Sequence, residues 1–227
     1  WFLSVGYEKK FESFELTGER LGIDVGIKEL AVCSDGETKG NINKTHAVKQ
    51  IEKKLKREQR KLSRKLEANI KSRDKNQRPI YIKPLKDMRN IQKQNQIIRN
   101  LHKKLNDIRT NHLHQCSSEI VKTKPSRIVM ETLNVKGMMK NKHLSKAIAG
   151  QKLNEFKRQI QYKCQKYGIE FVEADKWYPS SKTCSCCGRI KSDLKLKDRV
   201  FICECGFKLD RDLNASINLA NYQIQRT

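Results

Sequence analysis

The sequence is poor in aromatic residues and proline, and it has no long apolar run. Phe, Tyr and Trp make up 7% of the 227 residues, and there are 4 prolines. No apolar run approaches the roughly 18 residues of a membrane-spanning helix, and no signal peptide is recognisable. No basic amphipathic helix carries Trp or Phe anchors. These absences argue against a membrane partner.

Several catalytic signatures are also missing. The sequence contains no Ser/His/Asp arrangement, no phosphate-binding P-loop and no GxGxxG fingerprint. It has no internal repeat and no long low-complexity tract. The sequence therefore gives no support for a serine hydrolase, a P-loop NTPase or a dinucleotide-binding enzyme.

Positive charge is what the sequence has in excess. Lys and Arg number 49 against 25 Asp and Glu, which gives a net charge of +24. A charge this large indicates a polyanion, and nucleic acid is favoured over a membrane surface. Residues 49–110 hold 21 Lys and Arg against 6 Asp and Glu, a net charge of +15. Tyr81 is their one aromatic residue, so contact with phosphates is favoured over base readout. The alternative is a solvated helical hairpin whose charges contact nothing specific.

The order of predicted elements indicates an α/β fold. Two apolar runs within residues 19–34 predict strands, the Asp-Gly pair in SDGE predicts a hairpin turn, and a third short strand is expected near residues 39–42. Together they form an antiparallel meander. Apolar residues at helical spacing predict two amphipathic helices within residues 49–110, the second continuing towards Ile120. Pro79 and Pro84 predict a loop between them.

The second half of the chain alternates between strand and helix. The predicted elements are a buried strand at 127–133, a loop at 134–150, a helix at 152–167 that ends at Gly168, a strand at 169–175, a cysteine module at 184–206 and a helix at 212–221. A meander followed by alternating α and β units is an RNase H-like order. We therefore expect an RNase H-like mixed sheet with an inserted helical hairpin and a small metal-binding module.

Three acids stand at the ends of segments that we expect to be buried. They are Asp24 in LGIDVGIKELAV, Glu131 in RIVMETLNV and Asp212 in LDRDLNASINL. A buried acid is costly unless it is paired or binds a metal, and converging carboxylates suit Mg²⁺ or Mn²⁺. Two such ions would activate a water and stabilise a departing oxygen during attack on phosphorus.

Each acid also has a simpler explanation. Asp24 would then be a turn or edge acid, and Glu131 an exposed partner for Lys or Arg. Asp212 would be an acid favoured by the helix dipole. We assign Asp210 mainly to capping of the last helix.

Four cysteines have the spacing of a closed metal site. They follow the pattern Cys184-x₂-Cys187-x₁₅-Cys203-x-Cys205, and Gly188 and Gly206 follow the second cysteine of each pair. Two tight turns would present four thiolates to a structural Zn²⁺, whose binding would contribute folding free energy. The second pair has one intervening residue where two are usual, and Cys186 is an alternative ligand in the first. Clustering without a signal peptide favours a metal site over disulfides.

The motifs around these residues resemble one family. The segments are GIDVGIKELAV, IVMETLNVKGMMKN, KTCSCCG and CECGFKLDRDLNASINL. They resemble the RuvC-like nuclease half of transposon-encoded TnpB (OrfB) proteins, RNA-guided DNA endonucleases related to type V CRISPR effectors. The resemblance extends from about Leu3 to Asn221 in the same order. It implies catalytic acids at Asp24, Glu131 and Asp212.

The resemblance also implies partners and parts. It implies a guide RNA and target DNA, with a zinc ribbon formed by Cys184, Cys187, Cys203 and Cys205. The apolar opening WFLSVGYE predicts a strand that needs a partner, so we expect a fragment of a longer protein. The expected parts are the tail of a missing wedge-like domain at 1–17, RuvC part I at 18–48, a basic helical insert at 49–122, RuvC part II at 123–176, a zinc ribbon at 177–208 and RuvC part III at 209–227.

The sequence thus leads to one hypothesis and two main alternatives. The hypothesis is a Mg²⁺-dependent, RuvC-type endodeoxyribonuclease that is RNA-guided in its full-length form. We expect it in the cytoplasm of a prokaryote, associated with the nucleoid. The first alternative is a nuclease-inactive, nucleic-acid-binding regulator, and the second is a DNA-joining transposase. A structural RNA-binding module is a third, which the acid triad argues against.

Overall fold

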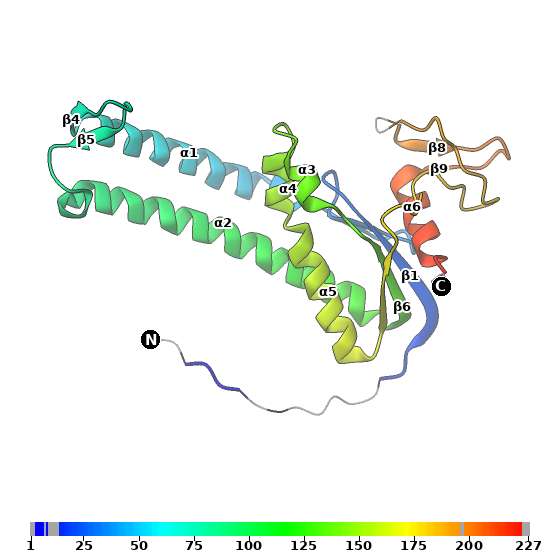
Figure 1. Ribbon diagram of the computed structural model, residues 1–227. Coiled ribbons are helices and arrows are strands. Elements are labelled where there is room, and N and C mark those ends of the chain that lie inside the picture. Colours follow the sequence, from blue (N-terminus) through cyan, green and yellow to red (C-terminus); the bar gives the residue numbers. More distant parts are fainter. Residues whose placement is uncertain (1–2, 7, 9–13, 196–197, 224–227) are drawn as a thin grey trace. The chain divides into compact units, whose positions relative to one another are not determined.

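The computed structural model describes residues 3–6, 8, 14–195 and 198–223 (Figure 1). The chain divides into two compact units. One unit comprises residues 1–41 and 113–227, and the other comprises Ile42–His112. The strand predicted over WFLSVGYE falls partly outside the described residues, and Leu3–Gly6 within it are not in a strand.

A five-stranded mixed sheet forms the centre of the first unit. Its strands are β1 (Thr17–Val25), β2 (Ala31–Cys33), β3 (Thr38–Lys39), β6 (Pro125–Glu131) and β7 (Glu170–Ala174). The spatial order is β3-β2-β1-β6-β7. Strands β1, β2 and β3 pair antiparallel, and β6 pairs parallel to both β1 and β7. The α/β class, the mixed sheet and the N-terminal meander are as predicted.

The turn between β2 and β3 follows the chemistry of its Asp-Gly pair. Gly36 has φ +90, a left-handed conformation that favours glycine. Its N–H donates to the carbonyl of Cys33 at 3.0 Å. The predicted hairpin turn is confirmed, and it fixes the register in which β3 returns beside β2.

Helices cover both faces of this sheet. The helices of the first unit are the end of α2 (Arg89–Lys122), α3 (Val135–Met139), α4 (Ser145–Gln151), α5 (Leu153–Tyr167) and α6 (Arg211–Ala220). The main core lies on one face, where Ile23, Ile128 and Met130 pack against residues of α2 and α5 such as Val121 and Phe156. On the other face Val129, Val172 and Leu219 form a smaller cluster. The sheet is therefore buried on both sides, as expected of parallel strands.

The helix predicted at 152–167 ends where expected. Gly168 has φ +71, and its N–H donates to the carbonyl of Gln165, so it caps α5 in the left-handed conformation. The loop predicted at 134–150 is wrong, because α3 and α4 lie there. Asn134 caps α3 by accepting a hydrogen bond from the N–H of Gly137 at 3.0 Å. Ile148 of α4 is buried, so tertiary packing stabilises this short helix despite its glycine.

The second unit contains the basic helices. Helix α1 (His46–Glu67) follows a 3₁₀ turn at Ile42–Lys44 and pairs its apolar face with α2 through Val48, Leu55, Leu101 and Leu105. Instead of a plain loop, the connection holds an antiparallel pair, β4 (Ile70–Arg73) and β5 (Pro79–Tyr81), and a 3₁₀ turn at Leu85–Asp87. The two amphipathic helices predicted from the periodicity are present, whereas the segment predicted as a loop from its two prolines contains a β-hairpin.

The cysteine module contains the last two strands. Strands β8 (Val200–Ile202) and β9 (Lys208–Asp210) pair antiparallel, and β9 leads directly into α6. Phe201 is fully buried and packs with Cys184 and Cys203. Among the described residues, no helix is both long enough and apolar enough to cross a membrane.

Candidate functional site

Asp24 and Glu131 occupy neighbouring positions on two parallel strands. Ile23 lies opposite Met130 in the register of β1 and β6, so Asp24 and Glu131 follow at the next level. Ile23 and Met130 belong to the main core, and successive side chains of a strand alternate between the faces of a sheet. The two carboxylates therefore project from the opposite face, near the carboxyl ends of both strands.

Helix α6 packs on that face by close contact with a glycine. A Cβ added to Gly22 would lie 1.9 Å from the carbonyl oxygen of Ser216 and 2.4 Å from the backbone nitrogen of Ala220. The backbones of β1 and α6 thus touch without a side chain between them. Only glycine allows this approach.

The contact at Gly22 also sets the position of Asp212. Asp24 lies two residues beyond Gly22, a step of about 6.6 Å along the strand. Asp212 lies four residues before Ser216, a step of about 6 Å along the helix axis. The two steps match in length, so the first turn of α6 carries Asp212 to the end of β1 where Asp24 lies.

Electrostatics support the same arrangement. Burial raises the pKa of Asp24 well above its ordinary value, and the charges of Glu131 and Asp212 raise it further, while Arg211 opposes them. Burial also raises the pKa of Glu131. The structure therefore brings the three predicted acids together, and we call Asp24, Glu131 and Asp212 the acid site.

Asp212 is held by two arginines. Its Oδ1 accepts hydrogen bonds from Nε of Arg211 at 3.3 Å and from Nη2 at 3.2 Å, and its Oδ2 lies 3.7 Å from Nη1 of Arg199. Asp210 caps α6 instead, since its Oδ1 accepts from the N–H of Asp212 at 2.9 Å and of Leu213 at 3.2 Å. The predicted capping role of Asp210 is confirmed.

Asp24 and Glu131 have no comparable support. Within the described ranges, neither carboxylate makes a hydrogen bond or an ion pair. Shielded carboxylates without donors are costly unless they are protonated or bind a cation. An oxygen-only set of this kind suits Mg²⁺ or Mn²⁺, so the residues present fit such an ion chemically.

The acid site is less compact than the cysteine cluster. In the described part of the chain, four cysteines are the group of potential ligands whose atoms all lie within 4.8 Å of one another, and the acids form no such group. A site for two ions about 3.5–4 Å apart is wider than a site for one ion. The wider spacing of the three acids is therefore compatible with a site for two ions.

The four predicted cysteines converge. The Sγ atoms of Cys184 and Cys205 are 3.8 Å apart, and those of Cys187 and Cys203 are 3.6 Å apart. A tetrahedral Zn²⁺ with Zn–S bonds of about 2.3 Å requires sulfurs about 3.8 Å apart. Each of these distances joins one cysteine of the first sequence pair to one of the second, and both fit this geometry. The single residue between Cys203 and Cys205 is therefore compatible with the site. The exposed Cys186 is not in the cluster.

Two glycine turns shape the cluster and aim N–H groups at the sulfurs. Gly188 has φ +76 and Gly206 has φ +87. Burial raises the pKa of Cys184, and the backbone N–H of Cys187 opposes that rise. Mainly because the N–H of Cys205 donates to its sulfur, the pKa of Cys203 falls to about 7. The N–H groups thus favour the thiolate form, which binds a metal, at Cys203, whereas the pKa values of Cys184, Cys187 and Cys205 are raised.

Two buried asparagines connect the cysteine module to α6. Asn214 accepts a hydrogen bond from the N–H of Ser185 at 3.0 Å, and its Nδ2 donates to the carbonyl of Thr183 at 2.7 Å. Asn218, one turn later, donates from Nδ2 to the carbonyls of Ser180 at 2.8 Å and Thr183 at 2.7 Å. The helix that carries Asp212 therefore also holds the segment that begins the cysteine cluster.

Asn214 and Asn218 are not among the functional residues that the sequence motifs predict. Asn214 is 0% exposed and Asn218 is 5% exposed, so both are core residues. The available signal was two asparagines four residues apart on the apolar face of a helix. Such residues need partners, because burying an amide without a hydrogen bond is costly.

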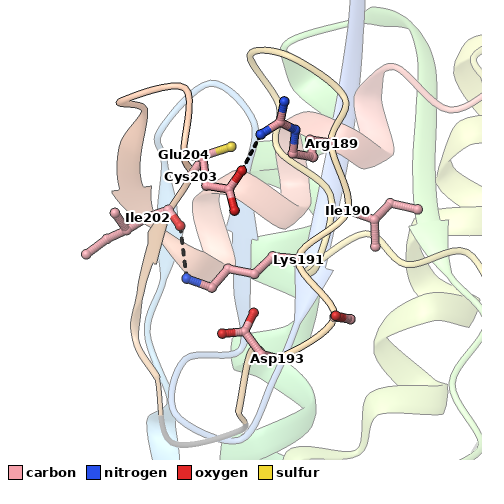
Figure 2. Close-up of a pocket in the computed structure, with 8 residues that line it drawn as sticks. Arg189, Ile190, Lys191, Asp193, Ile202, Cys203 and Glu204 are labelled. Carbon is pink, nitrogen blue, oxygen red and sulfur yellow. Dashed lines mark hydrogen bonds and ion pairs between the residues drawn. The ribbon is translucent and has the colours of Figure 1, made fainter.

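The cysteine module also has a cavity of about 190 Å³, separate from the acid site. Figure 2 shows Arg189 and Glu204 paired across it, and Nζ of Lys191 directed at the carbonyl of Ile202, to which it donates at 3.1 Å. None of the three acids lines this cavity. Both basic side chains are held by the module itself, so the cavity adds nothing to the acid site.

Two family models match the chain. The model OrfB_IS605, described as "Probable transposase", matches residues 4–142. A second model, described as "Cas12f1-like, TNB domain", matches residues 154–219. The first match contains Asp24 and Glu131, and the second contains Asp212 and the four cysteines.

Known proteins resemble the chain along nearly all its length. A protein of Streptomyces pristinaespiralis named "Putative RNA-guided DNA endonuclease" is 32% identical over 219 residues, which cover 96% of this chain and 49% of that protein. A Mycobacterium tuberculosis protein with the same designation is 32% identical over 92% of this chain and 42% of its own length. The chain thus spans about half the length of these curated relatives.

A solved structure has the same fold. The "Cryo-EM structure of CRISPR-Cas12f Ternary Complex" matches with a TM-score of 0.64 at 23% identity, covering 99% of this chain and 42% of that chain. At this identity the likeness concerns the fold alone. The mixed sheet and its helices therefore follow an architecture already seen in a larger protein.

Proposed function

The chain belongs to the OrfB_IS605 family, and from that premise we propose that it is the nuclease part of a metal-dependent, RuvC-type DNA endonuclease. In its full-length form the protein would be guided by RNA and encoded by a transposable element. The observation that carries this proposal is the acid site, where two adjacent strands and one helix each contribute a carboxylate. The designations of its relatives as RNA-guided DNA endonucleases support the same activity.

The proposed fold class is RNase H-like. In support, a β-meander is followed by parallel strands, and a helix packs over the acids. We propose the parts as the sequence suggests them, with RuvC segments at 18–48, 123–176 and 209–227, a helical insert at 49–122 and a zinc ribbon at 177–208. Residues 1–17 would be the tail of a wedge-like domain.

Asp24, Glu131 and Asp212 would hold Mg²⁺ or Mn²⁺. When bound, two such ions supply a water of lowered pKa and neutralise charge on the departing oxygen. The role of the chain is to aim the three carboxylates at one region. Arg211 favours the ionised form of Asp24, and the close packing at Gly22 holds Asp212 beside it.

The cysteine cluster would hold a structural Zn²⁺. Sulfur separations of 3.6 and 3.8 Å and N–H groups directed at the thiolates support this role. A closed set of four thiolates leaves no open position for catalysis, so the ion would serve folding. The zinc ribbon would then lie against α6 through Asn214 and Asn218.

DNA and guide RNA are the proposed partners, and we propose that the protein acts in the cytoplasm at the nucleoid. The net charge of +15 over residues 49–110 supports contact with nucleic acid phosphates. If this segment neutralises about six phosphates, affinity should fall about a thousandfold between 50 and 200 mM salt. Individual basic residues would then matter less than their sum.

The deciding experiment measures Mg²⁺-dependent cleavage by the full-length protein loaded with its guide. Asp212→Ala and Asp212→Asn should abolish cleavage while leaving DNA binding intact. Asp193→Ala, which changes an exposed aspartate of the cysteine module, is the matched control and should cut normally. Undiminished cleavage by both Asp212 variants would reject the assignment.

The same assay separates the alternatives. The family description as a probable transposase makes DNA joining the second candidate, and joined products in the presence of Mg²⁺ or Mn²⁺ would favour it. A regulator would bind DNA without cutting it in either metal. If the protein is such a regulator, the Asp212 variants should bind DNA as the parent does, and neither the parent nor the variants should cut it.

A further inference from the structure

Trp177 is the most exposed large apolar side chain of the folded part beyond residue 14. It is 81% exposed, in a chain with 2 tryptophans. It lies in the segment between β7 and Cys184, and it has no role in the proposed catalytic site. An exposed indole on a rigid support is a feature that needs a function, because Trp has a large apolar surface.

The backbone on either side of this indole is fixed. The N–H of Trp177 donates to Oδ1 of Asp175 at 2.7 Å, and the N–H of Asp175 donates to the hydroxyl of Tyr222 at 3.2 Å. Tyr178 packs edge-on against Tyr222, with ring centroids 4.9 Å apart, and donates its hydroxyl to the carbonyl of Asn218 at 3.1 Å. The neighbours of Trp177 thus anchor it to α6 while its own ring faces solvent.

The position of Trp177 relates it to the acid site. In the register of β6 and β7, Glu131 lies opposite Ala174, the last residue of β7. Trp177 follows three residues later, within about 10 Å of chain from that strand end. Trp177 therefore follows the same carboxyl-terminal end of the parallel strands at which Asp24 and Glu131 lie.

A lysine lies beside the indole, and the described segment that carries it is otherwise without exposed large apolar side chains. Nζ of Lys176 lies 4.8 Å from the centroid of the indole ring, within the range of a cation–π contact. In the described part of the chain, no other exposed large apolar side chain occurs between Tyr162 and Ile190. An apolar protein interface would need such neighbours, whereas one aromatic face beside a lysine matches a nucleotide, which has a flat base and a phosphate.

Building on the proposed nuclease function, we propose that Trp177 is a stacking platform for an unpaired base of the single-stranded DNA that approaches the acid site. The indole stacks on the base and Lys176 contacts the adjoining phosphate. The anchored backbone means that little conformational freedom is lost on binding. Stacking recognises any base, so the platform holds the strand without selecting its sequence.

The test uses the full-length, guide-loaded protein with Asp212→Asn, so that bound DNA is not cut. Fluorescence anisotropy measures its Kd for a labelled oligothymidine, and irradiation of the same oligomer with one 5-iodouracil maps the contact by mass spectrometry. Trp177→Ala should weaken binding about 5- to 150-fold, and Trp177→Phe should retain most of the affinity. The cross-link should map to Trp177 in the parent.

The matched control is Tyr162→Ala, which removes an exposed aromatic ring from α5 that also has basic neighbours. It should leave the Kd unchanged. A Kd for Trp177→Ala within twofold of the parent, or a cross-link that maps elsewhere, would overturn the proposal. Both readouts are binding measurements. If the nuclease assignment is wrong, the unmutated protein should fail to cleave DNA. That failure is therefore distinguishable from failure of the stacking proposal.

Discussion

Gly22 and Ser216 lie in direct backbone contact. The carbonyl oxygen of Ser216 is 1.9 Å from the point that a Cβ on Gly22 would occupy. Because Asp24 follows Gly22 on β1 and Asp212 precedes Ser216 on α6, this contact sets the separation of two of the three acids. The segment GIDVG thus contributes both an acid of the site, Asp24, and the glycine that lets α6 approach, Gly22.

Gly22→Ala should therefore be destabilising. The atoms that an added methyl group would meet belong to backbone, which has no rotamer to relieve the clash, so we expect a loss of about 3 kcal/mol or more in the free energy of unfolding. Urea unfolding of the full-length protein measures this loss, and cleavage should fall with it as α6 is displaced. Gly18→Ala, in the exposed part of the same strand, has open space around its Cβ and should change the free energy by less than about 0.5 kcal/mol. Equal stability of the two variants would contradict the close contact.

The cysteine cluster predicts a specific pattern of zinc loss. Cys203→Ser removes one of four converging sulfurs, so the purified protein should contain less than about one fifth of the zinc in the parent, and the cysteine module should unfold locally. Atomic absorption measures the zinc, and hydrogen exchange of residues 183–206 measures the unfolding. Cys186→Ser is the matched control, because this exposed cysteine is in the same turn but outside the cluster. Equal zinc loss in both variants would mean that the ligand set is wrong.

The elements that sequence analysis predicted well are those with local physical causes. Strand alternation is enough to turn Asp24 away from Ile23, and the spacing of the cysteine pairs predicted their cluster. The cap at Gly168 and the capping role of Asp210 depend on residues within one turn of helix, so the sequence around them was sufficient. The catalytic roles of the three acids remain predictions, although the fold gathers them.

The elements that were missed depend on distant contacts. Helix α4 has seven residues and a glycine, and it forms because Ile148 is buried and Gln151 donates to the carbonyl of Gly26 at 3.0 Å, far away in sequence. The β4–β5 hairpin has strands of four and three residues, too short for alternation to be visible. The partners of Asn214 lie 29 and 31 residues away, so no local pattern could identify them.

Glu155 should contribute to stability against acid. Hydrogen bonds from Arg158 and Gln159 lower its pKa to about 2, from about 4.3 in an unfolded chain. Because the folded pKa is depressed, this contribution is fully present above about pH 4.3 and is lost as pH falls towards 2. The side chain is 26% exposed, so solvent screening limits the contribution to less than about 1 kcal/mol.

Glu155→Gln should accordingly lower the Tm at pH 6 by a few degrees and leave it nearly unchanged at pH 2. Thermal unfolding followed by circular dichroism at both pH values measures the difference. Glu19→Gln is the control, since Glu19 is exposed in β1 and its carboxylate has no partner in the described part of the chain. A Tm difference for Glu155→Gln that is the same at pH 2 and pH 6 would show that the charge of Glu155 makes no contribution.

Asn214 and Asn218 should couple the cysteine cluster to the acid site. Asn214→Ala leaves the part-buried carbonyl of Thr183 with one donor fewer and the N–H of Ser185 without its acceptor, which should cost about 1–3 kcal/mol. The segment 180–185 should exchange amide hydrogens faster, and cleavage should fall although every proposed metal ligand is present. Gln161→Ala, which removes an exposed side-chain amide from α5, is the control and should change neither readout. If Asn214→Ala loses stability and protection of this segment yet cuts DNA at the parental rate, the cysteine module folds beside the acid site without positioning it.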